Sequence, residues 1–66
     1  MAVLKVIEVL ANSEVSWEDA TRRAVKHAAK SVKQIKSVYI NEQSAIVNGD
    51  DVTEFRVNVK ITFEVK

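Results

Sequence analysis

The sequence predicts an α+β fold in the order β-α-β-β, with a three-stranded antiparallel sheet packed on one helix. Three patterns support this fold: a β-branched stretch near the start, an apolar stripe at helical spacing in the middle, and two-residue alternation at the end. An Asn-Gly turn separates the last two predicted strands. We expect one domain over residues 1–66, because so short a chain has room for only one thin core.

The first strand is predicted over Val3 to Leu10, where apolar side chains occupy both alternation faces and indicate burial on both. Residues 12–16 then supply turn and capping side chains. Ser16 is the expected N-cap of the helix, because its hydroxyl can accept a hydrogen bond from the free amide of Asp19.

The helix is predicted to begin at Trp17 and to run for about five turns. Half of its apolar stripe is alanine, which implies close approach to whatever covers it; the stripe consists of Trp17, Ala20, Ala24, Ala28, Val32 and Ile35. The opposite side is basic and consists of Arg22, Arg23, Lys26, Lys30, Lys33 and Lys36. We expect this basic side to be a solvated face, and we assign Trp17 to packing and His27 to no function.

Two strands are predicted after the helix, over Ser37–Val47 and Phe55–Val65, joined through a turn at residues 48–51. The last strand alternates apolar and polar residues without interruption. A strand of about twelve residues runs to ~40 Å, which is longer than one short helix can cover. Part of its apolar face is therefore expected to meet another subunit.

The composition excludes several classes of function. The chain has no cysteine, which rules out disulfides and thiolate metal sites, and its net charge of +1 provides no overall field for nucleic acid. No apolar run approaches the roughly 20 residues of a membrane span, and we expect a cytoplasmic protein. No nucleophile and base are spaced as in a catalytic site, so we do not expect an enzyme.

Self-association is the remaining source of stability. A domain this small usually needs disulfides, a metal or oligomerisation. A three-stranded sheet also leaves edge strands with unpaired backbone groups, and the chain has no proline to block them. We therefore expect a closed homo-oligomer.

Several segments together resemble the dodecin family. They are the Lys-Val-Ile-Glu opening at residues 5–8, the turn at residues 13–17, the Asn-Glu-Gln step at residues 41–43, and the closing Thr-Phe-Glu-Val at residues 62–65. The resemblance implies a β-α-β-β monomer and twelve copies arranged in a hollow shell. In many members it also implies flavin pairs bound where subunits meet.

The same resemblance points to candidate ligand residues. In flavin-binding members a tryptophan at the start of the second strand stacks on the flavin, and a glutamine on the third strand bonds its edge. Ser37 and Arg56 stand at these two places, and Gln43 lies near them. Without the stacking tryptophan the chain is more similar to the subgroup called calcium dodecins, which implies calcium binding without flavin.

Oxygen ligands for calcium are available at Asp50 and Asp51 in the predicted turn and at Glu42 in the second strand. We favour calcium over riboflavin or FMN as the ligand. Two alternatives stay open: a flavin-storing dodecin with an altered site, and an interaction module that docks through the basic helix. The first partner expected is another copy of the chain, whereas a membrane or nucleic acid is not expected.

Overall fold

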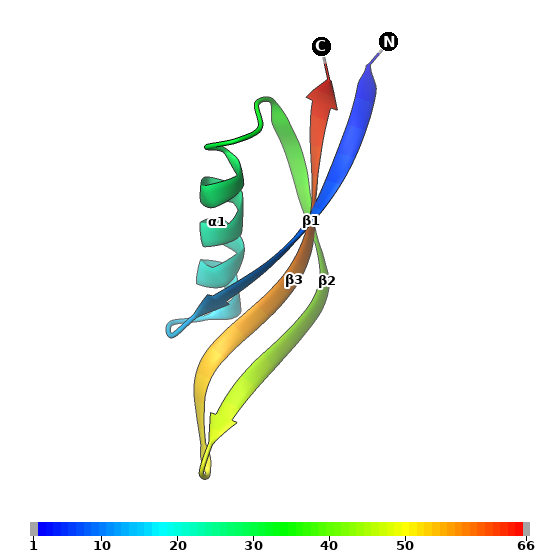
Figure 1. Cartoon of the computed structure of the whole chain (residues 1–66). Helices are drawn as coiled ribbons and strands as arrows, with labels where there is room; N and C mark the ends of the chain where they lie inside the picture. The colour runs from blue at the N-terminus through cyan, green and yellow to red at the C-terminus, as the bar shows by residue number, and fades with distance from the viewer. Residues whose placement is uncertain (1, 66) are drawn as a thin grey trace.

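The structure, a computed structural model, describes residues 2–65. Four elements follow one another in the predicted order: β1 (Val3–Ser13), α1 (Trp17–Ala28), β2 (Ile35–Asn48) and β3 (Asp51–Val65). The strands form one three-stranded sheet in the order β1-β3-β2, with both pairings antiparallel (Figure 1). The predicted fold is confirmed.

The core lies between α1 and the central strand β3. The alternation of β3 buries Val57, Val59 and Ile61 completely, each with 0% exposure. They belong to one cluster with the three buried alanines of α1: Ala20, Ala24 and Ala28. Alanine allows the helix to approach the sheet closely, as the stripe predicted. Figure 1 shows α1 on one side of the sheet only, so the other face has no cover within residues 2–65.

The predicted length of the helix is wrong. With 12 residues, α1 has a little over three turns instead of five. After Ala28 the chain turns, and Gln34 adopts a positive φ of 61° before β2 begins. Val32 and Ile35 lie beyond the helix but still pack against the core, so the stripe identified core residues and misplaced the helix end. As the only helix of residues 2–65, α1 falls well short of the ~20 residues of a bilayer span.

A long hairpin formed by β2 and β3 extends beyond the first turn of α1 (Figure 1). Asn48 pairs with Asp51, so the two loop residues are Gly49 and Asp50. Gly49 has a φ of 68°, which suits a two-residue turn with glycine in its first position. The chain as a whole measures 50 × 19 × 13 Å, an elongated shape with little interior.

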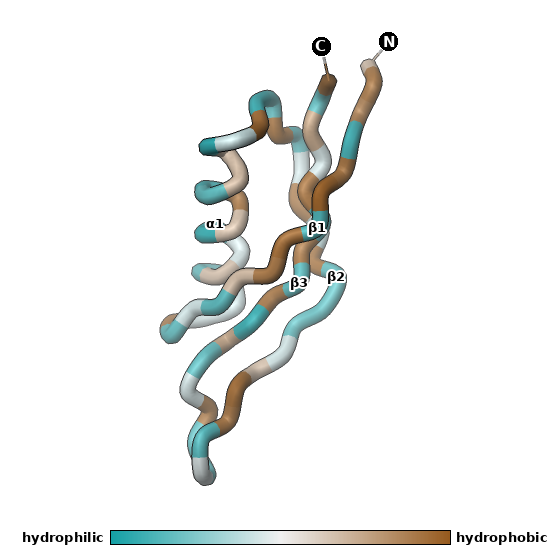
Figure 2. Tube along the Cα trace, in the orientation of Figure 1, coloured by the Kyte–Doolittle hydropathy of each residue, from teal (hydrophilic) through white to brown (hydrophobic). Residues whose placement is uncertain are grey.

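The prediction that β1 is buried on both faces is wrong for the single chain. Ile7, Val9 and Ala11 pack against the core. The alternate residues point to the uncovered face, where Leu10 is 66% and Val6 57% exposed. Figure 2 shows this strand as one of the most apolar segments of the chain. The apolar composition of β1 predicts that its second face is also buried, but no described residue of the same chain covers that face.

Candidate ligand sites and the uncovered sheet face

The uncovered face of the sheet carries rows of mixed polarity. Lys60 of β3 lies in register between Glu8 of β1 and Tyr39 of β2. In the adjacent row of this face, Asn58 lies between Leu10 and Glu42. Residues directly opposite one another in antiparallel strands have Cβ atoms about 4.5–5.5 Å apart. The register therefore brings acidic, basic and apolar side chains together on a surface that α1 does not cover.

Arg56 of β3 lies on the same face, and its side chain bonds to Asn12 of β1 in a short chain of hydrogen bonds. Its Nε donates to Asn12 Oδ1 at 2.9 Å, and Asn12 Nδ2 donates to Glu54 Oε1 at 3.2 Å. Asn12 and Glu54 also line an open depression of about 350 Å³ together with Ser13, Glu14, Val15 and Arg23. No local sequence pattern predicts the part played by Asn12, which depends on the register that pairs Asn12 with Arg56.

The three positions near the family flavin site do not meet within one chain. Ser37 pairs with Thr62, whereas Arg56 pairs with Ser44. The two rows are six residue steps apart along β3, so Ser37 and Arg56 lie about 20 Å apart. Gln43 pairs with Val57, whose side chain faces α1, so Gln43 lies on the opposite face from Arg56. A common site would require contributions from different copies.

The predicted calcium ligands are also separated. Asp50 is in the hairpin loop and Asp51 begins β3, but Glu42 pairs with Asn58, about 24 Å further along the strand. Within residues 2–65, no three Asp, Glu or His side chains are grouped closely enough to hold a metal ion. A site with the six to eight oxygen ligands that calcium requires would need carboxylates from more than one copy.

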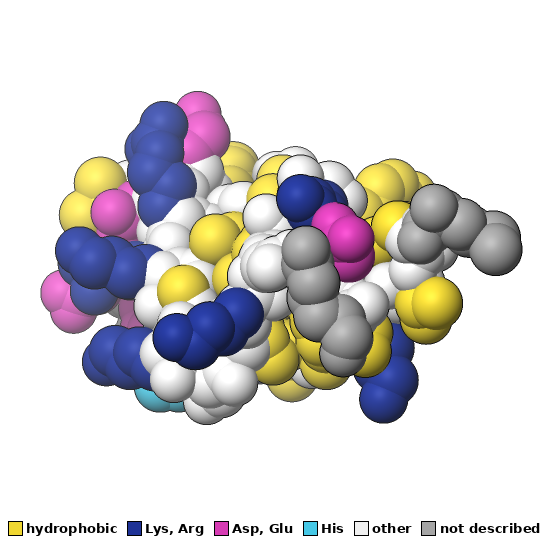
Figure 3. Space-filling view, turned by 90° about the horizontal axis from the view of Figure 1, so that it is seen from above, with side chains coloured by type: hydrophobic (Ala, Val, Ile, Leu, Met, Phe, Trp, Pro, Cys, Tyr) yellow, Lys and Arg dark blue, Asp and Glu magenta, His cyan; other side chains and the backbone are white. Residues whose placement is uncertain are grey.

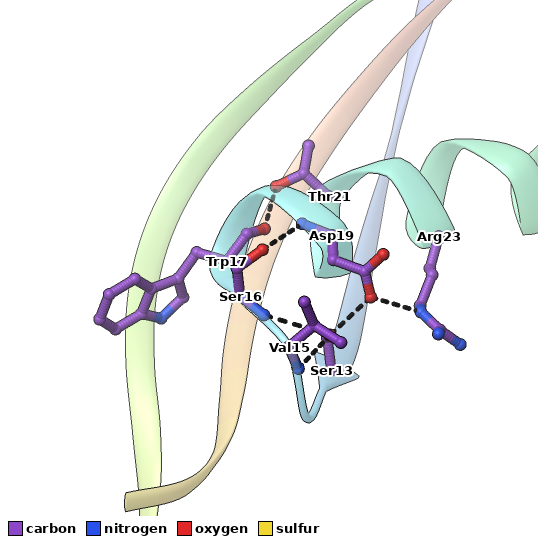
Figure 4. A network of polar contacts seen from close by, with 7 residues as sticks. All are labelled: Ser13, Val15, Ser16, Trp17, Asp19, Thr21 and Arg23. Carbon is purple, nitrogen blue, oxygen red and sulfur yellow. Dashed lines mark hydrogen bonds and ion pairs between the residues drawn. The ribbon is translucent and has the colours of Figure 1, made fainter.

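A polar network shapes the connection from β1 to α1 (Figure 4). Ser13 Oγ accepts from the amide of Val15 at 2.9 Å and donates to Asp19 Oδ2 at 2.6 Å. Arg23 Nε donates to the same carboxylate oxygen at 2.7 Å. The hydrogen bond from Ser13 and then that from Arg23 hold the pKa of Asp19 below its usual 3.8. Ser16 Oγ accepts from the amide of Asp19 at 3.0 Å, which confirms the predicted N-cap.

Trp17 joins the start of α1 to the hairpin. Its indole Nε1 donates to the carbonyl oxygen of Ser44 at 2.8 Å. Its ring meets Phe55 edge to face, with centroids 4.9 Å apart and an interplanar angle of 71°. This geometry uses both the polar and the apolar parts of the indole for packing, as expected from its sequence position.

The fold and the register agree with one known family. Residues 3–66 match the family model described as Dodecin. The chain belongs to the dodecin family. Among curated dodecins, it is 32% identical to calcium dodecin of Mycobacterium tuberculosis over 66 residues, which is 100% of this chain and 93% of the relative.

Solved dodecin structures extend this similarity. The crystal structure of Mycobacterium tuberculosis calcium dodecin, described as a calcium chelating immunodominant antigen with a novel calcium-binding site, has a TM-score of 0.84 and 31% identity, covering 97% of this chain and 91% of its own. A mutant of Thermus thermophilus dodecin has a TM-score of 0.93 at 23% identity, covering 100% and 98%. Dodecin from Streptomyces coelicolor has a TM-score of 0.93 at 20% identity, covering 98% and 93%. The last two show the shared fold.

Proposed function

We propose that this dodecin assembles into a closed shell of twelve copies, and that the shell binds or buffers a small ligand, with calcium favoured over flavin. One observation carries the proposal: the sheet leaves a row of large apolar side chains exposed on the face opposite α1. No catalytic role is proposed, since the residues around Arg56 and Asp19 form packing and capping contacts.

The exposed row is too apolar for a stable single chain. In the described chain only six hydrophobic residues are buried, and three of them are alanines. Leu4, Val6 and Leu10 remain exposed along one face of β1. A surface of this kind marks an association site. A second copy is the occupant that fits, because the edge strands β1 and β2 also have backbone groups to pair.

Calcium is favoured as the ligand by the identity with calcium dodecin over the whole chain. Glu42, Asp50 and Asp51 are exposed carboxylates with oxygen ligands available to neighbouring copies. Their separation within one chain means that the proposed site is completed only in the assembly. We therefore expect calcium binding and assembly to be coupled.

Flavin binding is the weaker alternative. Ser37 provides no aromatic face, and the resulting loss of stacking is about 1–3 kcal/mol per ligand ring by analogy with base stacking. Arg56 already donates to Asn12. Trp17 lies in the contact with Phe55 and Ser44, so it does not replace the missing stacking residue.

The assembly is tested by size-exclusion chromatography with light scattering. We expect a mass of about twelve chains at micromolar concentration, because the similarity to dodecins implies twelve copies and most soluble homo-oligomers are closed. A cooperatively folded monomer at this concentration would overturn the shell and every ligand site that depends on it.

The ligand is tested on the assembled protein by thermal melts in EDTA, calcium or magnesium, and by the fluorescence of added FMN. We expect stabilisation by calcium at concentrations where magnesium has little effect, and no quenching of FMN. The variants Asp50→Asn with Asp51→Asn, and separately Glu42→Gln, are expected to reduce the calcium effect, whereas Glu18→Gln on α1 is the control. Quenching of FMN fluorescence, together with no change in melting temperature on adding calcium, would favour flavin over calcium as the ligand.

A further inference from the structure

Opposite charges gather at the two ends of the elongated chain. Asp50 and Asp51 are exposed at the turn of the long hairpin, and we call them the acidic tip. Lys30 and Lys33 are exposed in the connection between α1 and β2, and we call them the lysine loop. Figure 1 places these two segments at opposite ends of a molecule that is 50 Å long. Figure 3, which looks down on the end with the lysine loop, shows lysine and arginine side chains projecting around the helix side.

Neither end is neutralised by its own chain. The two ion pairs within residues 2–65 join Arg23 to Asp19 and Lys36 to Glu64, so they involve neither the acidic tip nor the lysine loop. At physiological ionic strength, charges separated by more than about 8 Å are largely screened from each other. The two ends of one 50 Å chain therefore cannot compensate each other, whereas the ends of two copies can.

Apolar side chains accompany both charged ends. Next to the acidic tip, Val47 and Val52 pair across the hairpin and are 61% and 54% exposed. At the same end of the long axis as the lysine loop, the start of β1 exposes Val3 and Leu4, although β1 lies apart from the α1–β2 connection (Figure 1). Only the acidic tip therefore has exposed aliphatic side chains directly beside its charges, and the signs of the charges at the two ends are complementary.

We propose that the acidic tip of one copy docks against the lysine loop of the next copy, and that this ionic contact makes the assembly sensitive to salt. The inference rests on the proposed shell and adds which surfaces meet within it when Asp50 and Asp51 hold no calcium ion. A contact between two different ends is heterologous, and successive heterologous contacts form closed structures when their rotation closes. Complementary charges at such a contact also select the correct orientation of the incoming copy.

A zero-length carbodiimide cross-link tests the contact directly. The reagent joins a carboxylate to an amine only when the two touch, and the ends of one chain are too far apart to do so. We expect mass spectrometry of the cross-linked wild-type assembly to find peptides that join Asp50 or Asp51 to Lys30 or Lys33. Cross-links elsewhere in the assembly without any between these two segments would overturn the proposal.

Charge reversal provides a second test, with light scattering in EDTA to remove any effect of bound cations. We expect Asp50→Lys with Asp51→Lys to raise the concentration at which half of the assembly dissociates by about tenfold or more, since like charges then meet. Lys30→Glu with Lys33→Glu should have a similar effect, and the four substitutions together should restore assembly. The matched control, Glu14→Lys with Glu18→Lys, changes the net charge equally on two exposed residues away from the tip.

The outcomes separate this contact from the shell itself. Wild-type protein that assembles equally at low and high salt, with reversal variants that match the control, would overturn the contact and leave the shell intact. Wild-type protein that is monomeric even at low salt would overturn both. Failure of the fourfold variant to assemble, with each twofold variant folded by circular dichroism, would also contradict the direct pairing of tip and loop.

Discussion

Ser13 is the single buried polar residue among residues 2–65, with 5% exposure, and its hydroxyl organises the turn into α1. It accepts from the amides of Val15 and Ser16 and donates to Asp19. Ser13→Ala leaves these groups without their partner, and we expect a loss of about 1–2 kcal/mol of unfolding free energy. Denaturant unfolding at a fixed protein concentration measures it. Ser31→Ala, at an exposed position, should change little, and an equal effect of both would contradict the assigned role.

The carboxylate of Asp19 predicts a pH dependence at the same residue. Its pKa in the folded chain is lowered below 3.8, first by the hydrogen bond from Ser13 and then by that from Arg23. The folded state therefore binds the proton less readily than the unfolded state, and the resulting stability is present above pH 3.8 and lost as the pH falls through the lowered value. We expect Asp19→Asn to lower the melting temperature at pH 7 and to differ less from wild type at pH 3. A constant difference at both values would refute this linkage.

At the scale of the elements, the alanines of α1 set the distance between helix and sheet. Ala24 is 2% exposed and belongs to the same buried cluster as Val57, Val59 and Ile61. Ala24→Leu inserts three extra carbon atoms into this contact, and we expect a loss of about 1–3 kcal/mol through overpacking. Ala29→Leu, at the exposed C-cap residue that follows α1, is the control. Equal stability of the two variants in denaturant unfolding would show that the helix is not closely packed.

The turn of the hairpin tests backbone conformation separately from packing. A Cβ added at Gly49 would meet nothing within 4 Å, but the φ of this residue is +68°. Gly49→Ala should therefore cost about 1 kcal/mol through backbone strain alone. Gly49→Asn should cost less, because asparagine tolerates positive φ better than alanine does. Circular dichroism melts can rank the three proteins, and a destabilising effect of asparagine as large as that of alanine would point to a steric cause.

The sequence predicted those parts of the fold that depend on local patterns. The alternation through Val57, Val59 and Ile61 identified the buried face of β3, and Ser16 identified the start of α1. The end of α1 escaped prediction, because Val32 continues the helical spacing although it packs from a loop. The Asn12–Arg56 contact depends on strand register, which no local pattern encodes. The proposed ligand residues, Ser37, Gln43, Arg56, Glu42, Asp50 and Asp51, stay predictions, since each proposed site needs more than one copy.

For the whole molecule, the exposed face of β1 makes stability depend on concentration. If Leu4, Val6 and Leu10 are buried only between copies, dilution should lower the melting temperature by mass action. Leu10→Lys should dissociate the assembly, because it places a charge in that contact. Light scattering and melts over a hundredfold dilution series measure both effects. A melting temperature independent of concentration, with Leu10→Lys still assembled, would remove β1 from the interface.

The position of Trp17 makes it an intrinsic fluorescent probe of the hairpin. It is the only indole in the chain, and it spans the junction between the first turn of α1 and the β2–β3 hairpin. Any loosening of that hairpin exposes the ring to water and shifts its emission to longer wavelength. Stopped-flow measurements of tryptophan emission could therefore follow the packing of the hairpin against the start of α1 in each copy without an attached dye.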